Sequence, residues 1–309
     1  MSLTLVEAAK LHSGDVVRSA VIELFARNSD VMRILPFRDI PGNAFKYNLE
    51  GALPGIGFRG VNESYTPSTG VLNPQVEPLV IAGGELDVDR FITETMGADQ
   101  RAVQEAMKIK ALARKWDKTF IKGDTETTPK EFDGLQRRLA GDQLISAGST
   151  SGGDALSLAK LDELIDAVDN PQYLIMSKAV RRLLSAAARL STVGGYITYE
   201  QDAFGRKQTM YGDLPILLAD KDNNNTDILG YNEAGAGGGN SVCTSIYCIS
   251  TDEDKVQGLQ NGTMDVTVFP ELEEKPASRT RVEWYTGVAV FHPKGAARLY
   301  GIKSSAVTA

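Results

Sequence analysis

The chain has 309 residues, of which 42% are hydrophobic, and a formal net charge of −7 at pH 7. Such a chain can bury a substantial core in one large or two interleaved domains. The negative charge excludes tight, sequence-independent wrapping of nucleic acid, because that binding depends on neutralising phosphates; weak contact with an enclosed nucleic acid stays open. Since no apolar stretch reaches about 18 residues and no signal peptide is recognisable, we expect a soluble, cytoplasmic protein without a membrane partner.

The first 42 residues are interpreted as an N-terminal arm. Within residues 14–34, Val17, Val21 and Leu24 recur at helical spacing, and the pattern stops at Leu35-Pro36. The spacing predicts an arm with one helix.

Residues 43–84 form an extended tract with too little apolar material for a core of its own. Four prolines and seven glycines oppose helix, and the alternation of Phe45, Tyr47 and Leu49 predicts two long strands of a projecting hairpin. A lone two-stranded hairpin is only marginally stable, so we expect a neighbouring subunit to support it. The candidate inter-subunit contacts are Phe45, Tyr47, Phe58, Arg59, Glu63 and Tyr65.

A strand is predicted over 85–93, where Leu86 and Val88 alternate with acids and Phe91 and Ile92 close the run. The next segment, 99–122, contains neither Gly nor Pro and predicts a helix about 36 Å long, N-capped by Asp99 and ended by Gly123. Its core-facing stripe is expected to comprise Ala102, Ala106, Ile109, Ala113, Trp116 and Phe120.

The second half has the pattern of a separate α/β unit. The tail after residue 303 is expected to fray. Helices are predicted over 157–168, 178–189 and 294–299, strands over 173–176, 214–218, 245–249, 263–269 and 279–291, and flexible excursions over 191–209 and 223–241.

Gly55–Gly60 matches the dinucleotide-binding pattern G-x-G-x-x-G. That motif needs a buried strand before it and a helix after it, so that phosphate meets the helix N-terminus. Here Pro54 precedes it and Pro67 follows soon after, which favours the tip or a bulge of the hairpin.

Residues that could carry catalysis or bind metal are scattered. In Gly148–Gly152 the nucleophile's place of a serine-hydrolase elbow is taken by Thr150, and nothing local to His12 or His292 suggests a triad. Cys243 and Cys248 lie on opposite faces of a predicted strand about 16 Å apart, which excludes a mutual disulfide and favours two small buried residues.

Charged clusters are interpreted as solvated surface. The acidic runs at 252–254 and 271–274 have no calcium-loop spacing, and Arg137-Arg138 is interpreted as an exposed helix face. We therefore expect no catalytic residue, no cofactor and no metal, and a protein that is not an enzyme.

Five stretches, in this order, resemble the major capsid protein of tailed bacteriophages, which has the Hong Kong 97-like fold. The order of arm, hairpin, long helix, α/β unit and returning strands is also similar. The stretches are Trp116–Asp124, Glu131–Leu135, Tyr173–Val180, Gly212–Leu218 and Val282–Leu299.

The resemblance implies an α+β fold in which 43–84 is the extended loop over an adjacent subunit. Residues 85–135 and 264–309 would form the peripheral domain with its spine helix at 99–122, and 136–263 the axial domain around five- and six-fold axes. The protein would then be a major capsid protein that self-assembles, through pentamers and hexamers, into an icosahedral shell enclosing double-stranded DNA.

The resemblance also implies partners and a location. The short arm lacks the long coiled-coil region of self-scaffolding members, which implies a separate scaffolding protein; portal and decoration proteins would be further partners. The location would be the virion capsid, assembled in the host cytoplasm. Cross-linking members use a Lys and an Asn with a catalytic acid, a set that Lys46, Asn48 and Asn62 do not allow us to assign.

Other interpretations stay open. An encapsulin-like nanocompartment shell shares the fold but packages cargo enzymes. An α/β enzyme with a cofactor domain in the second half lacks candidate residues, and trimeric shell-decoration proteins are usually smaller.

Overall fold

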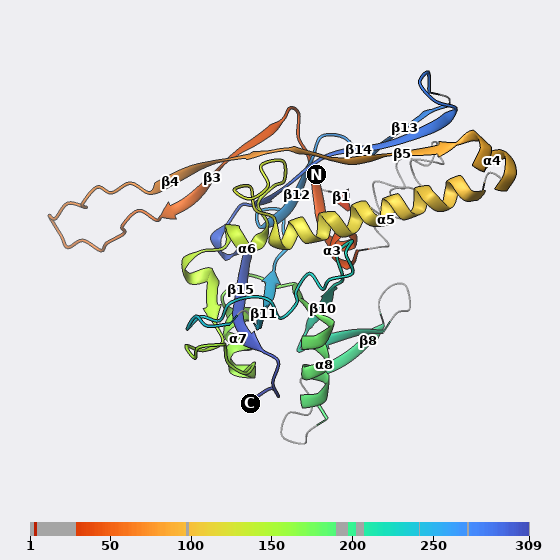
Figure 1. Cartoon of the computed structure of the whole chain (residues 1–309). Coiled ribbons are helices and arrows are strands. Elements are labelled where there is room, and N and C mark those ends of the chain that lie inside the picture. The colour runs from red at the N-terminus through yellow and green to blue at the C-terminus, as the bar shows by residue number, and fades with distance from the viewer. Residues whose placement is uncertain are drawn as a thin grey trace.

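The computed structural model describes residues 3–4, 29–96, 99–189, 197–201, 207–240, 242–270 and 272–308. Most of the predicted arm helix, together with His12, lies outside these residues. Its last part is the short helix α3 (Asp30–Ile34), which Ser29 caps by accepting a hydrogen bond from the Met32 amide. The architecture is mixed α+β, as the sequence predicts. In the view of Figure 1, a six-stranded sheet lies in the upper part of the molecule and a seven-stranded sheet in the lower part, and a two-stranded hairpin projects from the body.

The upper sheet is organised around the 14-residue strand β14 (Ala277–Val290). Its first part pairs with β5 (Val80–Asp89) on one edge and with β13 on the other, and its last part pairs with β12. From Thr280 to Tyr285 the side chains of β14 alternate between buried and more exposed, because one face of the sheet is covered by a long helix, and from Thr286 to Val290 every residue is buried. The remaining strands are β1 (Leu3–Thr4), β2 (Pro36–Asp39), β12 (Val256–Gln260) and β13 (Asp265–Phe269).

The covering helix is α5 (Asp99–Lys122), which has the predicted boundaries. Four members of the predicted stripe are buried: Ile109, Ala113, Trp116 and Phe120. The prediction is wrong for Ala102, which is exposed, and Ala106 is only half-buried. Near its start the helix meets the sheet through polar groups instead, because Arg101 donates to the Thr280 hydroxyl, which in turn donates to Glu105.

Aromatic rings fill the space between α5 and the upper sheet. The Trp116 ring stacks on Phe120 with centroids 5.3 Å apart and also contacts the rings of Phe37, Phe132 and Trp284. Its indole N–H donates to the Thr286 hydroxyl at 3.2 Å, so the polar end of this large side chain is satisfied. This cluster is the centre of the core beneath the upper sheet.

The strand predicted over 85–93 ends earlier than expected. Residues 90–93 belong to helix α4 (Arg90–Met96), and Phe91 and Ile92 are exposed rather than strand-closing. Asp89 explains the change, since its carboxylate accepts a hydrogen bond from the Phe91 amide and so caps the start of a helix.

The lower sheet has seven strands with helices α7 (Leu158–Asp166) and α8 (Lys178–Ala187) packed beside it (Figure 1). One of its inner strands is the fully buried β11 (Cys243–Ile249), in which the free cysteines Cys243 and Cys248 are both buried, as predicted. In spatial order the other strands are β6 (Leu144–Ser146), β15 (Ala296–Lys303), then beyond β11 the strands β7 (Tyr173–Ser177), β10 (Leu214–Ala219), β9 (Lys207–Tyr211) and β8 (Ile197–Gln201).

The helix predicted over 294–299 is wrong. Pro293–Gly295 make a single 3₁₀ turn, and the chain then enters strand β15, which pairs with β11 on one edge and β6 on the other. Ala296, Ala297 and Leu299 are fully buried there. A strand placed between two others gains a ladder on both edges, and this outweighs the helix propensity of Ala and Leu.

Each sheet takes one strand from the sequence range predicted for the other domain. Strand β12 lies inside the predicted axial range 136–263 but pairs in the upper sheet, and β15 lies inside the predicted peripheral range 264–309 but pairs in the lower one. The predicted division into domains stays a prediction. The first predicted excursion contains the hairpin β8–β9, and the second remains a loop. In the described part of the chain, no helix is long and apolar enough to cross a membrane.

Candidate functional site

The projecting hairpin consists of strands β3 (Ala44–Ala52) and β4 (Val71–Pro78), joined by residues 53–70. The strands pair antiparallel from Ala44 opposite Pro78 outward, and they pair with no other described strand. In Figure 1 the hairpin leaves the body on the left, at the side away from helix α4. The extended tract expected from the sequence is therefore present as a two-stranded arm.

The tip of the hairpin, residues 53–70, exposes large apolar side chains. Ile56 is 95% exposed, and Leu53, Phe58, Val61 and Tyr65 are also exposed. Several large apolar side chains exposed on one short segment are typical of an interaction site in a folded protein. The G-x-G-x-x-G pattern at 55–60 lies in this tip, with no regular helix after it, so the sequence-based interpretation as a hairpin tip is confirmed.

Polar contacts within the tip give it a defined shape. The Arg59 guanidinium lies 5.3 Å from the centre of the Tyr65 ring and donates to the Glu63 carbonyl at 3.1 Å. The Glu63 carboxylate accepts a hydrogen bond from the Gly60 amide at 2.8 Å. Asn62 turns the chain with a φ of 67°, a conformation that Asn tolerates better than most residues. Four of the predicted contact residues, Phe58, Arg59, Glu63 and Tyr65, therefore lie in the tip, where Arg59 contacts both Glu63 and Tyr65.

The other two predicted contact residues, Phe45 and Tyr47, lie at the base of the hairpin and pack within the chain. The Tyr47 and Phe291 rings meet edge to face at 4.9 Å, and Phe45 lies between Phe291 and the Arg38 guanidinium. The Tyr47 hydroxyl is within hydrogen-bond reach of the Val290 carbonyl and the Glu77 carboxylate. Burial, followed by the negative charge of Glu77, raises the pKa of Tyr47 to about 12, so this phenol remains a hydrogen-bond donor.

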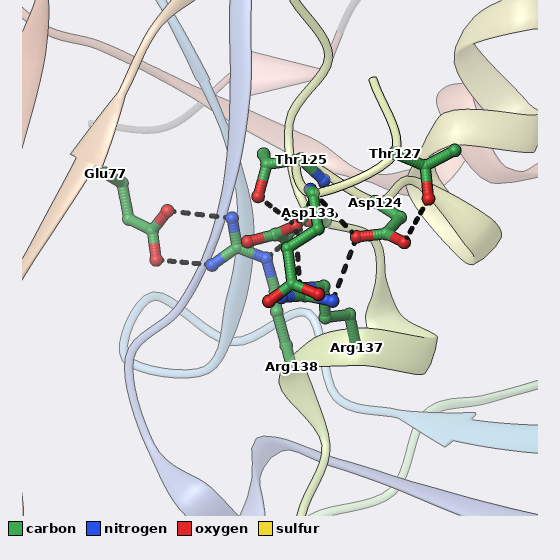
Figure 2. A network of polar contacts seen from close by, with 8 residues as sticks. Glu77, Asp124, Thr125, Thr127, Asp133, Arg137 and Arg138 are labelled. Atoms are coloured by element: carbon green, nitrogen blue, oxygen red, sulfur yellow. Dashed lines mark hydrogen bonds and ion pairs between the residues drawn. The ribbon is translucent and has the colours of Figure 1, made fainter. Parts of the chain in front are cut away.

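The base is also held by an ion pair between Glu77 on β4 and Arg138 at the end of helix α6 (Leu135–Arg138). Both Glu77 carboxylate oxygens accept from the two terminal nitrogens of the Arg138 guanidinium, one of them at 2.7 Å, and both side chains are only 13% exposed (Figure 2). The Arg138 Nε–H donates to the Asp133 carbonyl at 2.6 Å. The interpretation of Arg137-Arg138 as a solvated helix face is therefore wrong for Arg138.

Arg138 is positioned by the segment 123–138, which directly follows α5. Arg137 binds Asp124, Glu126 and Asp133, and the Asp133 carboxylate also accepts from the Thr125 amide and hydroxyl (Figure 2). The segment folds back on itself where Gly123 and Gly134 cross. A Cβ at Gly123 would lie 2.2 Å from the Phe132 carbonyl oxygen.

Sequence reasoning missed the pair because its two members are 61 residues apart. One local signal was available, namely the four-residue spacing of Asp133 and Arg137, which allows an ion pair on a helical turn. That signal identifies the wrong arginine of the two, because only the tertiary structure brings β4 beside Arg138.

A cleft of about 470 Å³ opens between the base of the hairpin and the segment 123–138. Leu49, Val76 and Phe132 supply apolar walls, and the Glu77–Arg138 pair lies at one end of it. The hairpin is thus supported by Phe291 and Arg138 but has open space beside it.

The residues examined for other chemistry have structural partners. The Asp252 carboxylate accepts from the side chains of Asn170 and Gln172, and His292 Nδ1 accepts from the Lys294 amide. Asp154 accepts from the Thr150 amide in the loop that resembled a nucleophile elbow. Among the described residues, no three His, Cys, Asp or Glu side chains gather closely enough to hold a metal ion.

No protein-family model and no curated protein matches this sequence. Solved structures do match. The SrpI encapsulin of Synechococcus elongatus PCC 7942, in its holo-complex, is 16% identical with a TM-score of 0.64, over 90% of this chain and 89% of that one. The capsid of an empty GTA particle is 14% identical with a TM-score of 0.60, over 89% and 90%. A structure from Microbacterium phage Oxtober96 is 13% identical with a TM-score of 0.63, over 89% and 90%.

These similarities extend over about nine-tenths of each chain. The identities are too low to carry more than the fold. The chain has the Hong Kong 97-like fold, the fold of the major capsid proteins of tailed bacteriophages.

Proposed function

We propose that the protein is a shell-forming protein whose copies assemble into a closed particle. A fold by itself does not establish a function, so the proposal depends on a site. The observation that carries it is the hairpin tip, which places Ile56, Phe58 and Val61 in solvent at the end of an arm whose ring contacts with the described body lie at its base. Burying these side chains on a second copy would stabilise both the arm and the contact.

A second apolar patch lies at the opposite end of the molecule. Phe91 on α4 and Val103 and Met107 on α5 are exposed there, far from the tip (Figure 1). Two different apolar patches at opposite ends favour head-to-tail contacts over a symmetric dimer. Contacts of this type close into rings when the rotation between copies permits it, which fits pentamers and hexamers.

We further propose that the shell is a phage head that encloses double-stranded DNA. The net charge of −7 fits a wall that confines DNA without binding it tightly. In this proposal the shell assembles in the host cytoplasm, becomes part of the virion, and uses a separate scaffolding protein, a portal and decoration proteins. An encapsulin-like compartment is the second candidate, because the SrpI encapsulin matches at least as well as the capsids do.

Deleting residues 51–69 tests shell formation. The deletion removes the exposed tip but neither the Glu77–Arg138 pair nor the core, so we expect a folded subunit that forms no closed particles by electron microscopy. Normal shells from the deletion variant would contradict the role of the tip.

The contents of purified wild-type particles separate the two kinds of shell. Nuclease-protected double-stranded DNA, obtained when the neighbouring genes are co-expressed, would support the phage head. A co-purifying enzyme without DNA would support the compartment instead.

A further inference from the structure

The hairpin leaves the body at a defined angle, although its strands pair with no other described strand. Its direction must therefore be fixed at its base. The polar and ring contacts there include Arg38 on β2, the Val290–Phe291 end of β14, and Arg138 after α5. Phe45 and Tyr47 also pack against a small apolar cluster of Ile40, Leu259 and Ala289.

These contacts differ in how strongly they constrain direction. The ring contacts of Phe45 and Tyr47 with Phe291 are apolar, and rings of this kind can slide against one another at low cost. The Glu77–Arg138 contact is a two-point charged fork, which fixes both the distance and the relative orientation of its partners. At 13% exposure for each side chain, water competes weakly for either group.

The guanidinium is itself immobilised. Its Nε donates to the Asp133 carbonyl, and the Asp133 carboxylate is bound to Thr125 and Arg137 (Figure 2). The Glu77–Arg138 contact, called the fork below, thus connects β4 to the segment 123–138, which directly follows α5. The open cleft beside it means that, without the fork, the hairpin has room to swing.

We propose that Arg138 is a positioning residue that sets the direction of the hairpin in the free subunit, before any partner is present. The part of this inference that concerns assembly depends on the proposed shell function. In a shell, the hairpin's direction determines where its tip meets the next copy, and so the angle between copies. Loss of the fork would therefore change the size distribution of particles, while loss of the tip would abolish them.

Arg137 provides a matched control. It is the neighbouring residue on the same short helix, is also paired with carboxylates, and makes its ion pairs only within the segment 123–138. Arg137→Met and Arg138→Met both remove one paired arginine. After Arg137→Met, the Thr125 amide and hydroxyl still hold Asp133, whose backbone carbonyl accepts from Arg138, and the contact with Glu77 stays in place. Only Arg138→Met removes the contact with Glu77 on the hairpin. Arg138→Lys retains the charge without the two-point geometry and guards against a variant that fails to fold.

The first measurement is made on the unassembled full-length chain. Cysteines at the exposed positions Thr69 and Glu253 carry spin labels, and the distance between tip and body is measured by pulsed electron resonance. The native cysteines are buried and should remain unlabelled. We expect one narrow distribution for the wild type and Arg137→Met, and a broader, shifted one for Arg138→Met and Arg138→Lys. Equal distributions in all four proteins would overturn the inference.

The second measurement is amide hydrogen exchange at the base of β3 and β4. Loss of a hydrogen bond between charged groups predicts exchange that is roughly tenfold or more faster in Arg138→Met than in Arg137→Met. Unchanged exchange together with unchanged label distances would show that the aromatic contacts alone hold the base.

The third measurement is the size distribution of assembled particles. If the wild type forms no particles, the shell function fails while the label distances still test the role of Arg138. If the wild type and Arg138→Met form particles of the same size, the fork does not set the angle between copies.

Discussion

The hairpin and helix α5 lie close together in the sequence, yet they place their large side chains in opposite environments. On α5, Trp116 and Phe120 are almost fully buried in an aromatic cluster, whereas on the hairpin Ile56 and Phe58 are almost fully exposed. The body buries these large side chains within a single chain, whereas the tip leaves its own in solvent. We conclude that substitutions in the body should change the stability of the subunit, while substitutions at the tip should change only its contacts with other copies.

The largest expected effect is that of Trp116→Ala. Because Trp116 contacts four aromatic rings and donates to Thr286, we expect a loss of about 3 to 5 kcal/mol in the free energy of unfolding of the unassembled subunit. Urea unfolding measures it. Tyr65→Ala at the tip is the matched control and should leave the free energy of unfolding of the unassembled subunit unchanged. Equal losses for the two variants would contradict the conclusion that the body and the tip differ in their effect on stability.

Glu233→Gln should have the next largest effect. This buried carboxylate joins Lys122 at the end of α5 to Arg298 on β15, and so connects the long helix to the lower sheet. Burial alone would raise the pKa of Glu233, but the nearby Lys122 and Arg298 charges lower it. Neutralising it leaves both cations without a counter-charge, at a cost of about 3 kcal/mol by urea unfolding.

The control for that change is Glu163→Gln, which removes an exposed partner of Lys160 and should cost under about 1 kcal/mol. A Glu233→Gln variant as stable as this control would mean that the two sheets do not depend on the ionic cluster.

Asp117 makes the stability of the body depend on pH. Its buried carboxyl accepts a hydrogen bond from Ser29 at 2.5 Å, and burial raises its pKa to about 8, with Asp30 and Asp220 adding to the shift. Because the folded state holds this proton more tightly than the unfolded state, the stability from this group is fully present below its ordinary pKa of 3.8. It falls by up to about 1.4 kcal/mol per pH unit as the pH rises towards 8.

Asp117→Asn should remove this dependence, since the amide oxygen can still accept from Ser29. The variant should therefore gain stability over the wild type at pH 8 and much less at pH 5, measured by urea unfolding at both values. Asp87 and Asp154, whose pKa values are lowered by their partners, titrate below this window. A constant difference between the two proteins from pH 5 to pH 8 would show that Asp117 is ionised in the fold.

The smallest expected effect on stability is that of Phe58→Ser. The side chain is fully exposed and packs against nothing in its own chain, so the melting temperature should not change. Particle formation should nevertheless decrease, as measured by sedimentation and electron microscopy. Phe120→Ser is the body counterpart and should unfold the subunit instead; a lowered melting temperature for Phe58→Ser would place that ring in an intramolecular contact.

Each part of the fold that was predicted correctly depends on a pattern within a short stretch of sequence. Helix α5 was predicted at its observed ends because 24 residues without Gly or Pro repeat one apolar stripe. The buried strands β7, β10 and β11 are short apolar runs bounded by turns, and the tip was recognised by its prolines and glycines. Of the candidate site, the four tip residues do lie in the exposed tip, and their role as inter-subunit contacts stays a prediction, whereas the Glu77–Arg138 pair was not predicted.

The errors share a different property, which is that a distant segment decides the outcome. Residues 296–299 favour helix locally, but β11 and β6 flank them and make them a strand. Phe291, far away in the sequence, likewise contacts Phe45 and Tyr47 and leaves them half-buried, which their alternation alone did not indicate; their contact with another subunit stays a prediction.

The sequence by itself therefore determined where the long helix, the buried strands and the projecting tip lie, because those features depend on apolar periodicity and on Gly and Pro. The tertiary structure decided which sheet each strand joins and which arginine holds the hairpin. Strand pairing and buried ion pairs depend on the approach of residues far apart in the chain, and no local pattern encodes that approach. Only the folded chain places Arg138 against Glu77 and gives the exposed tip its direction.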